Sequence, residues 1–247
     1  MTVRFVGAGP GAPDLITLRA RDVLAASPVC LYAGSLVPAE VLAHCPPGAQ
    51  LVDTQGLTLD TIIETLAGAH TAGHEVARLC SGDPSLFSAV AEQLRRLDAL
   101  DIPWEIVPGV PAFAAAAAVL GRELTVPGVA QTIVLTRTSE RSSAMPTRED
   151  LATLAQARTT MIIHLSIQRI DAVVTELLPH YGPNTPAAVV AFASQPDQVV
   201  LRSQLADIAT LSREAGITKQ AVIIVGGALA ADGFRDSHLY SHQRIRD

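Results

Sequence analysis

The chain has 247 residues, 49% of them hydrophobic and 17% charged, which is enough for one large or two modest packed domains. Its formal net charge is −6 and its lysines and arginines are scattered, which disfavours a nucleic-acid partner because that would need a basic face. No apolar run reaches the ~18 residues of a membrane span, and no signal-peptide pattern opens the chain, so we expect a cytoplasmic protein without a membrane partner. The three cysteines, Cys30, Cys45 and Cys80, form no CxxC pair and are expected as reduced thiols.

The first half of the chain alternates short β-branched runs with longer segments of helical periodicity. This alternation predicts a parallel sheet with crossover helices. Thr17 is a plausible N-cap for the first helix, and Gly73 marks the end of the second. The predicted strands are 3–7, 29–32, 51–53, 75–80 and 104–107, and the predicted helices are 18–26, 57–72, 86–100 and 112–120.

The second half continues the alternation, with one exception. Two strands near 187–201 have no helix between them, which predicts a hairpin and therefore a mixed sheet. Residues 121–130 have no clear period, so we predict an α/β protein of two α/β domains, 1–121 and 130–247, with a polar tail after Gly233. The predicted strands are 132–136, 160–165, 187–193, 198–201 and 221–225, and the predicted helices are 147–157, 167–180 and 205–215.

Three loops of small residues each follow a predicted strand. They are Gly7–Ala12, Ser81–Pro84 and Pro108–Pro111. Open α/β sheets bind ligands at the carboxyl ends of their strands, so these loops predict a groove floored by backbone. Asp83 has two interpretations, as the N-cap of the next helix with Pro84 at its first position, or as a ligand contact.

The first loop also fits the dinucleotide pattern G-x-G-x-x-A. Two features oppose that interpretation. Pro10 lacks an N–H for a pyrophosphate, and the second strand, which ends near Tyr32, is followed by no acid that could hold a ribose hydroxyl.

As a set, the three loops and the segment 14–18 resemble the tetrapyrrole methylases, and the resemblance runs over residues 3–228. It implies two α/β domains with a cofactor trough between them, S-adenosylmethionine as methyl donor, a tetrapyrrole substrate and a homodimer. Further segments narrow the resemblance to a subgroup that methylates a ring carbon in cobalamin (vitamin B12) biosynthesis, although Gln195 stands where tryptophan is expected. These segments are 32–37, 53–59, 136–137 with Arg141, 160–166 and 193–197.

The resemblance also carries a cofactor-binding set, whose members would act mostly through backbone groups. Uroporphyrinogen methylases of the family have an aspartate and a lysine that this chain replaces with Ala33 and, approximately, Gln55, which argues against uroporphyrinogen as substrate. The cofactor-binding set is Pro10, Ser81, Gly82, Asp83, Leu86, Pro111, Ala112, Leu165 and Ala193.

Methyl transfer from a sulfonium mainly requires alignment of the reactants and exclusion of water, followed by loss of a proton. The hypothetical proton acceptors or ring-orienting groups are Tyr32, Ser35, Asp53 and His164. Structural alternatives exist for Tyr32 as a core residue, for Asp53 as a strand-end cap and for His164 as a satisfied buried histidine.

Precorrin substrates carry many carboxylates, which the planar guanidinium of arginine binds through two oxygens at once. Arg137 and Arg141 are the leading candidates, with solvated surface charge as the alternative. His70 and His74 have a metal-compatible spacing but no third ligand nearby, so no metal is predicted. The alternatives in function are methylation at another ring position, a dinucleotide-dependent oxidoreductase, and a non-catalytic tetrapyrrole-binding protein.

Overall fold

The structure, a computed structural model, describes residues 1–139 and 143–238. Two compact units make up the chain, the first ending at Ala115 and the second beginning at Ala116. This division falls inside helix α5 (Ala112–Leu120). The domain ranges 1–121 and 130–247 stay predictions.

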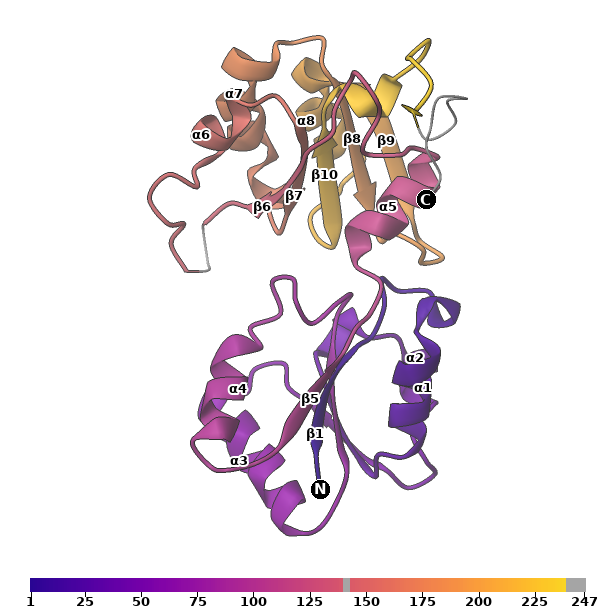
Figure 1. Ribbon diagram of the computed structural model, residues 1–247, viewed down its shortest axis with the longest axis vertical. Helices are drawn as coiled ribbons and strands as arrows, with labels where there is room; N and C mark the ends of the chain where they lie inside the picture. The colour runs from indigo at the N-terminus through magenta and orange to yellow at the C-terminus, as the bar shows by residue number, and fades with distance from the viewer. Residues whose placement is uncertain (140–142, 239–247) are drawn as a thin grey trace. The chain divides into compact units, whose positions relative to one another are not determined.

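The N-terminal unit is built on a five-stranded sheet in the order β3-β2-β4-β1-β5 (Figure 1). Every pairing in it is parallel, as the alternation of strands and helices predicts. The carboxyl ends of all five strands therefore lie at one edge. The strands are β1 (Val3–Gly7), β2 (Val29–Tyr32), β3 (Gln50–Asp53), β4 (Val76–Cys80) and β5 (Trp104–Val107).

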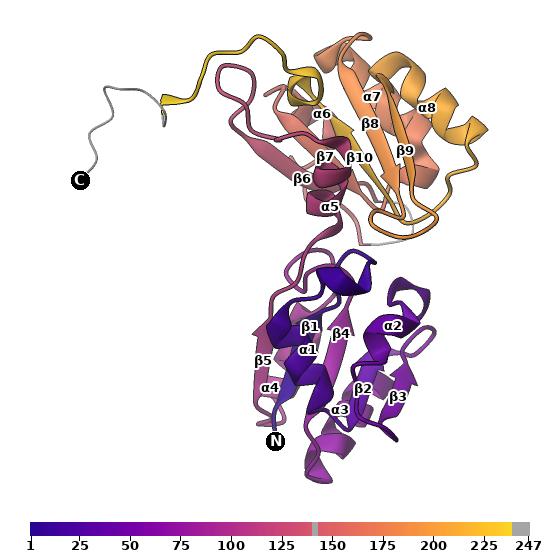
Figure 2. The same cartoon turned by 90° about the vertical axis from the view of Figure 1, so that its right-hand side faces the viewer.

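Helices cover both faces of this sheet. Helices α1 (Leu18–Ala25) and α2 (Ala39–Leu42) lie on one face, and α3 (Leu59–Thr71) and α4 (Ala91–Asp98) on the other (Figures 1 and 2). Each face has its own apolar core, because successive strand residues point to opposite sides: Val6 belongs to one core and Phe5 to the other. Thr17 accepts a hydrogen bond from the Ala20 N–H and caps α1, as predicted.

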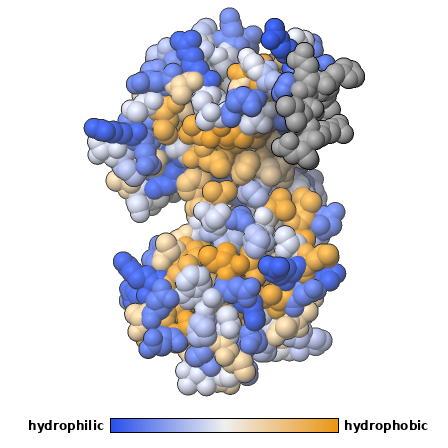
Figure 3. Space-filling view, in the orientation of Figure 1, coloured by the Kyte–Doolittle hydropathy of each residue, from blue (hydrophilic) through white to orange (hydrophobic). Residues whose placement is uncertain are grey.

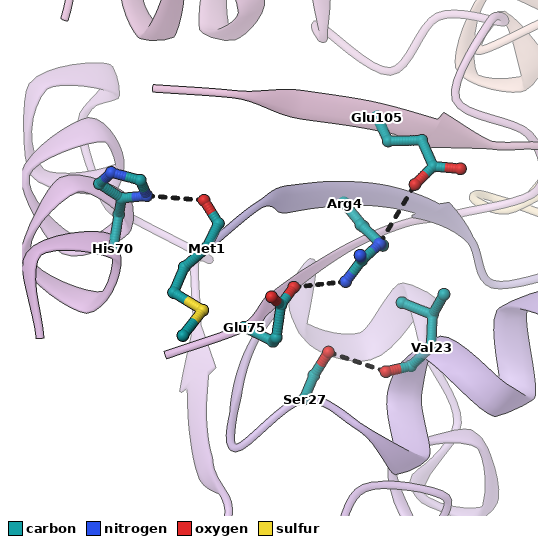
Figure 4. Close-up of polar contacts among 7 residues, drawn as sticks. All are labelled: Met1, Arg4, Val23, Ser27, His70, Glu75 and Glu105. Atoms are coloured by element: carbon teal, nitrogen blue, oxygen red, sulfur yellow. Dashed lines mark hydrogen bonds and ion pairs between the residues drawn. The ribbon is translucent and has the colours of Figure 1, made fainter. Parts of the chain in front are cut away.

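Side-chain contacts near the start of the sheet tie neighbouring segments together (Figure 4). The Arg4 guanidinium lies 2.5 Å from Glu75 and 3.2 Å from Glu105, which joins three adjacent segments. The Nδ1 atom of His70 lies 2.8 Å from the carbonyl oxygen of Met1, and the Ser27 hydroxyl donates to the Val23 carbonyl. These contacts join the amino ends of neighbouring strands to one another and the chain terminus to α3.

The C-terminal unit contains a mixed sheet in the order β6-β7-β10-β8-β9. Strands β6 and β7 are parallel, and the remaining pairs are antiparallel. The predicted hairpin is confirmed as β8 and β9, with Pro186 paired to Gln204. The strands are β6 (Ile133–Arg137), β7 (Thr160–His164), β8 (Pro186–Ala191), β9 (Val199–Gln204) and β10 (Ala221–Val225).

One face of the mixed sheet packs against α6 (Leu151–Ala155), α7 (Ile170–Tyr181) and α8 (Leu205–Glu214) over a single large apolar core. Helix α5 runs along the other face (Figure 2). There Leu120 of α5 and Ala188 of β8 line the same small cavity. Short 3-10 turns connect other elements. The N-terminal unit contains η1 (Pro13–Leu15) and η2 (Gly34–Leu36), and the C-terminal unit contains η3 (Ile167–Arg169) and η4 (Gly227–Ala230).

Two predicted helices are too long. Helix α4 begins at Ala91 rather than near residue 86, because Phe87 and Ala89 have φ values of +52° and +50°, which a right-handed helix excludes. Helix α6 begins only after Asp150, whose carboxylate caps it. Helix α2 was missed, since four residues carry no periodic signal. Among the described residues, no helix is long and apolar enough to cross a membrane.

Candidate functional site

The three small-residue loops of the sequence meet at the carboxyl edge of the N-terminal sheet. Strand β1 lies between β4 and β5, so the loops that follow these strands are neighbours. The Ala8 N–H donates to the Cys80 carbonyl at 2.8 Å. Gly9 and Gly82 exchange two main-chain hydrogen bonds, at 3.2 and 2.8 Å. The predicted convergence of the loops is therefore present, and it is made by backbone groups.

Glycine is required at this convergence because no side chain would fit. A Cβ atom on Gly7 would lie 2.5 Å from the Gly109 Cα and 2.8 Å from the Gly82 carbonyl oxygen. A Cβ atom on Gly109 would lie 2.8 Å from the Gly7 Cα, and closer still to the same oxygen. Backbone therefore approaches backbone more closely than a larger residue allows.

Asp83 joins the second loop to the third. One carboxylate oxygen accepts the Ser85 N–H at 2.8 Å and the Ser85 hydroxyl, and the other accepts the Gly109 N–H at 2.7 Å. Partial burial acts to raise the pKa of Asp83, but the hydrogen bonds from Ser85 and Gly109 outweigh it and hold the pKa below its ordinary value. Of the two interpretations of Asp83, the helix N-cap with Pro84 at the first position is wrong, because α4 begins at Ala91. Instead, the Asp83 carboxylate places a negative charge at the loops.

The second loop, which follows β4, also lies at a topological switch point. The chain leaves β2 towards β3 on one side of the sheet order, and it leaves β4 towards β5 on the other. Strands β2 and β4 are adjacent, so their connections diverge between them. Ligand sites of open α/β sheets form at this kind of divergence.

The chemistry of the loops fits a cationic adenosyl sulfonium better than a pyrophosphate. A pyrophosphate requires free N–H donors or positive charge, whereas Ala8 and Gly9 donate within the protein and Pro10 has no N–H. Asp83 adds a negative charge beside these groups. The structure brings together seven residues of the predicted cofactor set at this edge: Pro10, Ser81, Gly82, Asp83, Leu86, Pro111 and Ala112.

Three hypothetical catalytic residues follow neighbouring strands at the same edge. Tyr32 ends β2 and stands opposite Asp53, which ends β3. The carboxylate of Asp53 is exposed and accepts the Gln55 N–H at 2.8 Å, which is the strand-end turn foreseen as its structural alternative. Tyr32 is half-buried against the apolar core, and Ser35 lies in η2. Because β2 adjoins β4, these residues flank the cofactor loops.

The C-terminal unit has a polar edge of its own. Strands β6 and β7 are parallel, and β7 and β8 both run antiparallel to β10, so all three end at one edge. Arg137 and His164 end β6 and β7 directly opposite each other. Leu165 follows, largely exposed at a φ of +55°, and Ala193 follows β8. Arg141 lies outside the described residues.

Hydrogen bonds hold this polar edge in place. The Arg137 guanidinium donates to the Ser143 carbonyl at 3.0 Å, and Arg169 donates to the Ser139 carbonyl at 2.6 Å. The Ser166 hydroxyl donates to the His164 carbonyl and accepts from the Thr138 N–H, at 2.7 and 2.8 Å. Burial lowers the pKa of His164 to about 4, so its ring is neutral at physiological pH.

Sequence reasoning missed the positioning residues Ser85, Thr138 and Ser166. Each supports a predicted site residue rather than being one, through a short hydrogen bond to a side chain or to main chain. The spacing Asp83-x-Ser85 is a signal for the first, because an aspartate commonly accepts the N–H two residues on. Thr138 and Ser166 are 28 residues apart in the chain, and their hydrogen bond forms because the pairing of β6 with β7 brings them together.

Comparison with known proteins gives a consistent result. The family description "Tetrapyrrole (Corrin/Porphyrin) Methylases" matches residues 2–209. The precorrin-4 C(11)-methyltransferase of Rhodococcus erythropolis is 62% identical over 246 residues, 100% of this chain and 99% of that protein. The cobalt-precorrin-4 C(11)-methyltransferase of Methanocaldococcus jannaschii is 41% identical, covering 96% of this chain and 92% of that protein.

Solved structures agree with the sequence relatives. A cobalt precorrin-4 methyltransferase superposes with a TM-score of 0.90 at 37% identity, covering 93% of this chain and 96% of that one. The uroporphyrin-III C-methyltransferase of Thermus thermophilus, solved in complex with S-adenosylhomocysteine, gives a TM-score of 0.76 at 30% identity, covering 93% of this chain and 94% of that one.

Proposed function

The chain belongs to the tetrapyrrole methylase family, and from that premise we propose that it transfers the methyl group of S-adenosylmethionine to carbon 11 of precorrin-4 in cobalamin biosynthesis. The observation that carries the assignment is identity of 61–62% with precorrin-4 C(11)-methyltransferases over at least 99% of this chain. The subgroup predicted from the sequence segments is the same one.

The proposed substrate is the metal-free ring. Relatives that are 51–62% identical are named for precorrin-4, whereas those that are 37–41% identical are named for cobalt-precorrin-4. The metal-free pathway is therefore favoured by similarity of sequence.

The seven loop residues of the N-terminal edge, with Leu165 and Ala193, are proposed to hold the methyl donor. When bound, the donor supplies a methyl group already activated by its positive sulfur. The loops then act by positioning the donor, by excluding water and by offering carbonyl and carboxylate oxygens in place of donors for a phosphate. Asp83 contributes through its negative charge and through its bond to Gly109.

The ring-orienting or proton-accepting group is proposed to come from Tyr32, Ser35, Asp53 and His164. Among these, burial lowers the pKa of His164 to about 4, so its ring is neutral at physiological pH and is a weak proton acceptor. Arg137 and Arg141 are proposed to bind substrate carboxylates. A homodimer in the cytoplasm is the proposed working state.

The test is turnover with a located product. The protein is incubated with precorrin-4 and S-adenosylmethionine that carries a ¹³C methyl group, and the new methyl is placed by NMR. We expect labelling at C11, with slower turnover of cobalt-precorrin-4 in the matched assay. A label found at another ring carbon would show that the proposed position of methylation is wrong. Binding of NAD without binding of S-adenosylhomocysteine would replace the whole assignment with an oxidoreductase.

A further inference from the structure

Exposed apolar side chains recur along the carboxyl edge of the N-terminal sheet. Leu57 follows β3, Leu36 follows β2, Phe87 follows β4 and Leu18 follows β1, which are four neighbouring strands in that order. Their exposed fractions are 36%, 44%, 43% and 71%. Figure 3 shows hydrophobic and hydrophilic side chains interspersed on one face of this unit. Single exposed apolar residues are ordinary, but four along one edge form a row, which we name the apolar rim.

The exposed ring of Phe87 is held by a backbone conformation that is unfavourable for this residue. Its φ of +52° lies in the left-handed region, which is unusual for a bulky residue, and Ala89 repeats it at +50°. Between them, the Ser88 hydroxyl donates to the carbonyls of Asp83 and Leu86, at 3.1 and 3.0 Å. The segment that displays the ring is thus tied to the cofactor loop itself. Strained residues of this kind gather at ligand sites.

The loops of this edge carry no cationic side chain. Residues 8–17, 33–38, 54–58, 81–90 and 108–111 contain no lysine, arginine or histidine. A carboxylate-rich substrate therefore finds no cationic partner in these loops themselves, and the exposed Arg19 lies just outside them, after Leu18. The carbon-rich ring of the substrate, by contrast, meets an apolar surface here. Aromatic and aliphatic side chains bind such a ring by burying apolar area and by stacking.

We propose that the apolar rim, in particular Leu36, Leu57 and Phe87, is the surface that receives the face of the tetrapyrrole ring. The inference rests on the proposed function, and it deepens that function by naming residues that select an extended ring. The peripheral carboxylates are then bound outside the loops of this edge. Leu18 extends the rim beside the first glycine loop.

The test compares the double variant Leu57→Gln/Phe87→Asn with Leu100→Gln. Asparagine suits the left-handed backbone at position 87, so the ring is lost without added strain. Leu100 has a similar exposure of 51% but lies between α4 and β5, at the opposite end of the strands. For the double variant we expect KM for precorrin-4 to rise about tenfold, with the Kd of S-adenosylhomocysteine within about twofold of wild type. Leu100→Gln should match wild type.

Two results would overturn the proposal. They are an unchanged KM, whether or not light scattering shows a change of oligomeric state, and an equal loss of affinity for S-adenosylhomocysteine. If the wild-type protein does not methylate precorrin-4, the proposed function fails and the rim is still decided by titration with fluorescent coproporphyrin III. Weaker porphyrin binding by the double variant than by Leu100→Gln supports the rim, and equal binding overturns it.

Discussion

The carboxyl edges of the two sheets build their sites from different parts of the chain. In the N-terminal sheet, loops after β1, β4 and β5 are joined by main-chain hydrogen bonds and by contacts that only glycine permits. In the C-terminal sheet, the side chains of Arg137, Ser166 and Arg169 hold the corresponding edge. A backbone site fails when a small residue grows, whereas a side-chain site fails when a functional group is removed.

This difference also separates the expected sizes of effect. Adding one carbon where three loops touch displaces all of them together, since interiors are close-packed. Removing one guanidinium leaves the remaining contacts of its edge in place. The predictions that follow run from the first kind of change to the second, and each states a result that would blur the distinction.

Gly109→Ala should have the largest effect. Its new Cβ would collide with the Gly82 carbonyl and crowd Gly7, so the loops must separate. We expect the free energy of unfolding to fall by about 3 kcal/mol and the affinity for S-adenosylhomocysteine to fall at least about a hundredfold. Chemical denaturation measures the free energy of unfolding, and titration calorimetry measures the affinity.

Gly68→Ala is the matched control for that change. Gly68 lies within α3, where an added Cβ meets nothing within 4 Å, and alanine favours a helix. It should bind S-adenosylhomocysteine normally and be slightly more stable. If Gly109→Ala also bound normally, the contact between the loops would be irrelevant to the donor.

Asp83→Asn should come next. The amide keeps one oxygen for Ser85 but cannot offer a second acceptor to the Gly109 N–H. We expect an affinity loss of about thirtyfold for cationic S-adenosylmethionine and a smaller loss for neutral S-adenosylhomocysteine, because only the former is attracted by the carboxylate. Ser85→Ala, which removes one bond and keeps the charge, is the control. Equal losses for both ligands would mean that Asp83 acts only by holding the loops.

The same distinction explains what the sequence could reveal. Glycine and proline turns after strands are local patterns with a physical cause, so the three loops and their common edge were predictable from residues such as Gly7 and Gly109. Most strand ends were predictable within a residue or two, because strands such as β10 are runs of apolar and mostly β-branched residues, but β9 ends three residues beyond its predicted end.

What escaped prediction depends on contacts between distant segments or on strained backbone. The apolar periodicity of residues 86–100 favours a helix throughout, but Phe87 and Ala89 take left-handed conformations that delay α4. Asp83 followed by Pro84 is typical of a helix start, yet its carboxylate serves Gly109, 26 residues away. No local pattern records that pairing.

Arg137→Ala tests the side-chain edge. We expect KM for precorrin-4 to rise about tenfold, with affinity for S-adenosylhomocysteine unchanged, since Arg137 stands at the end of β6 and outside the glycine loops. Arg137→Lys keeps the charge but not the two-oxygen geometry and should recover only part of the affinity. Kinetics with precorrin-4 as the varied substrate measure this. A loss of donor affinity as large as that of Asp83→Asn would contradict the separation of roles.

The smallest effect at neutral pH concerns His164, and it becomes visible on acidification. Burial lowers the pKa of His164 to about 4 from 6.5, so the unfolded chain binds a proton more readily than the folded one. Above about pH 6.5 the histidine is neutral in both the folded and the unfolded chain, so its titration does not affect the free energy of unfolding. That free energy falls as pH falls from about 6.5 towards 4. Between pH 7.5 and 5.5 we expect a loss of about 1 kcal/mol from this group.

His164→Gln should remove that part of the pH dependence, because glutamine does not titrate, while Gly68→Ala should retain it in full. Denaturation curves at the two pH values give the difference for each variant. An unaltered slope in His164→Gln would show that the ring is solvated enough to protonate in the folded protein. The edge formed by the ends of β6 and β7 would then be more hydrated than its burial indicates. His164 could no longer be treated as a neutral ring opposite Arg137.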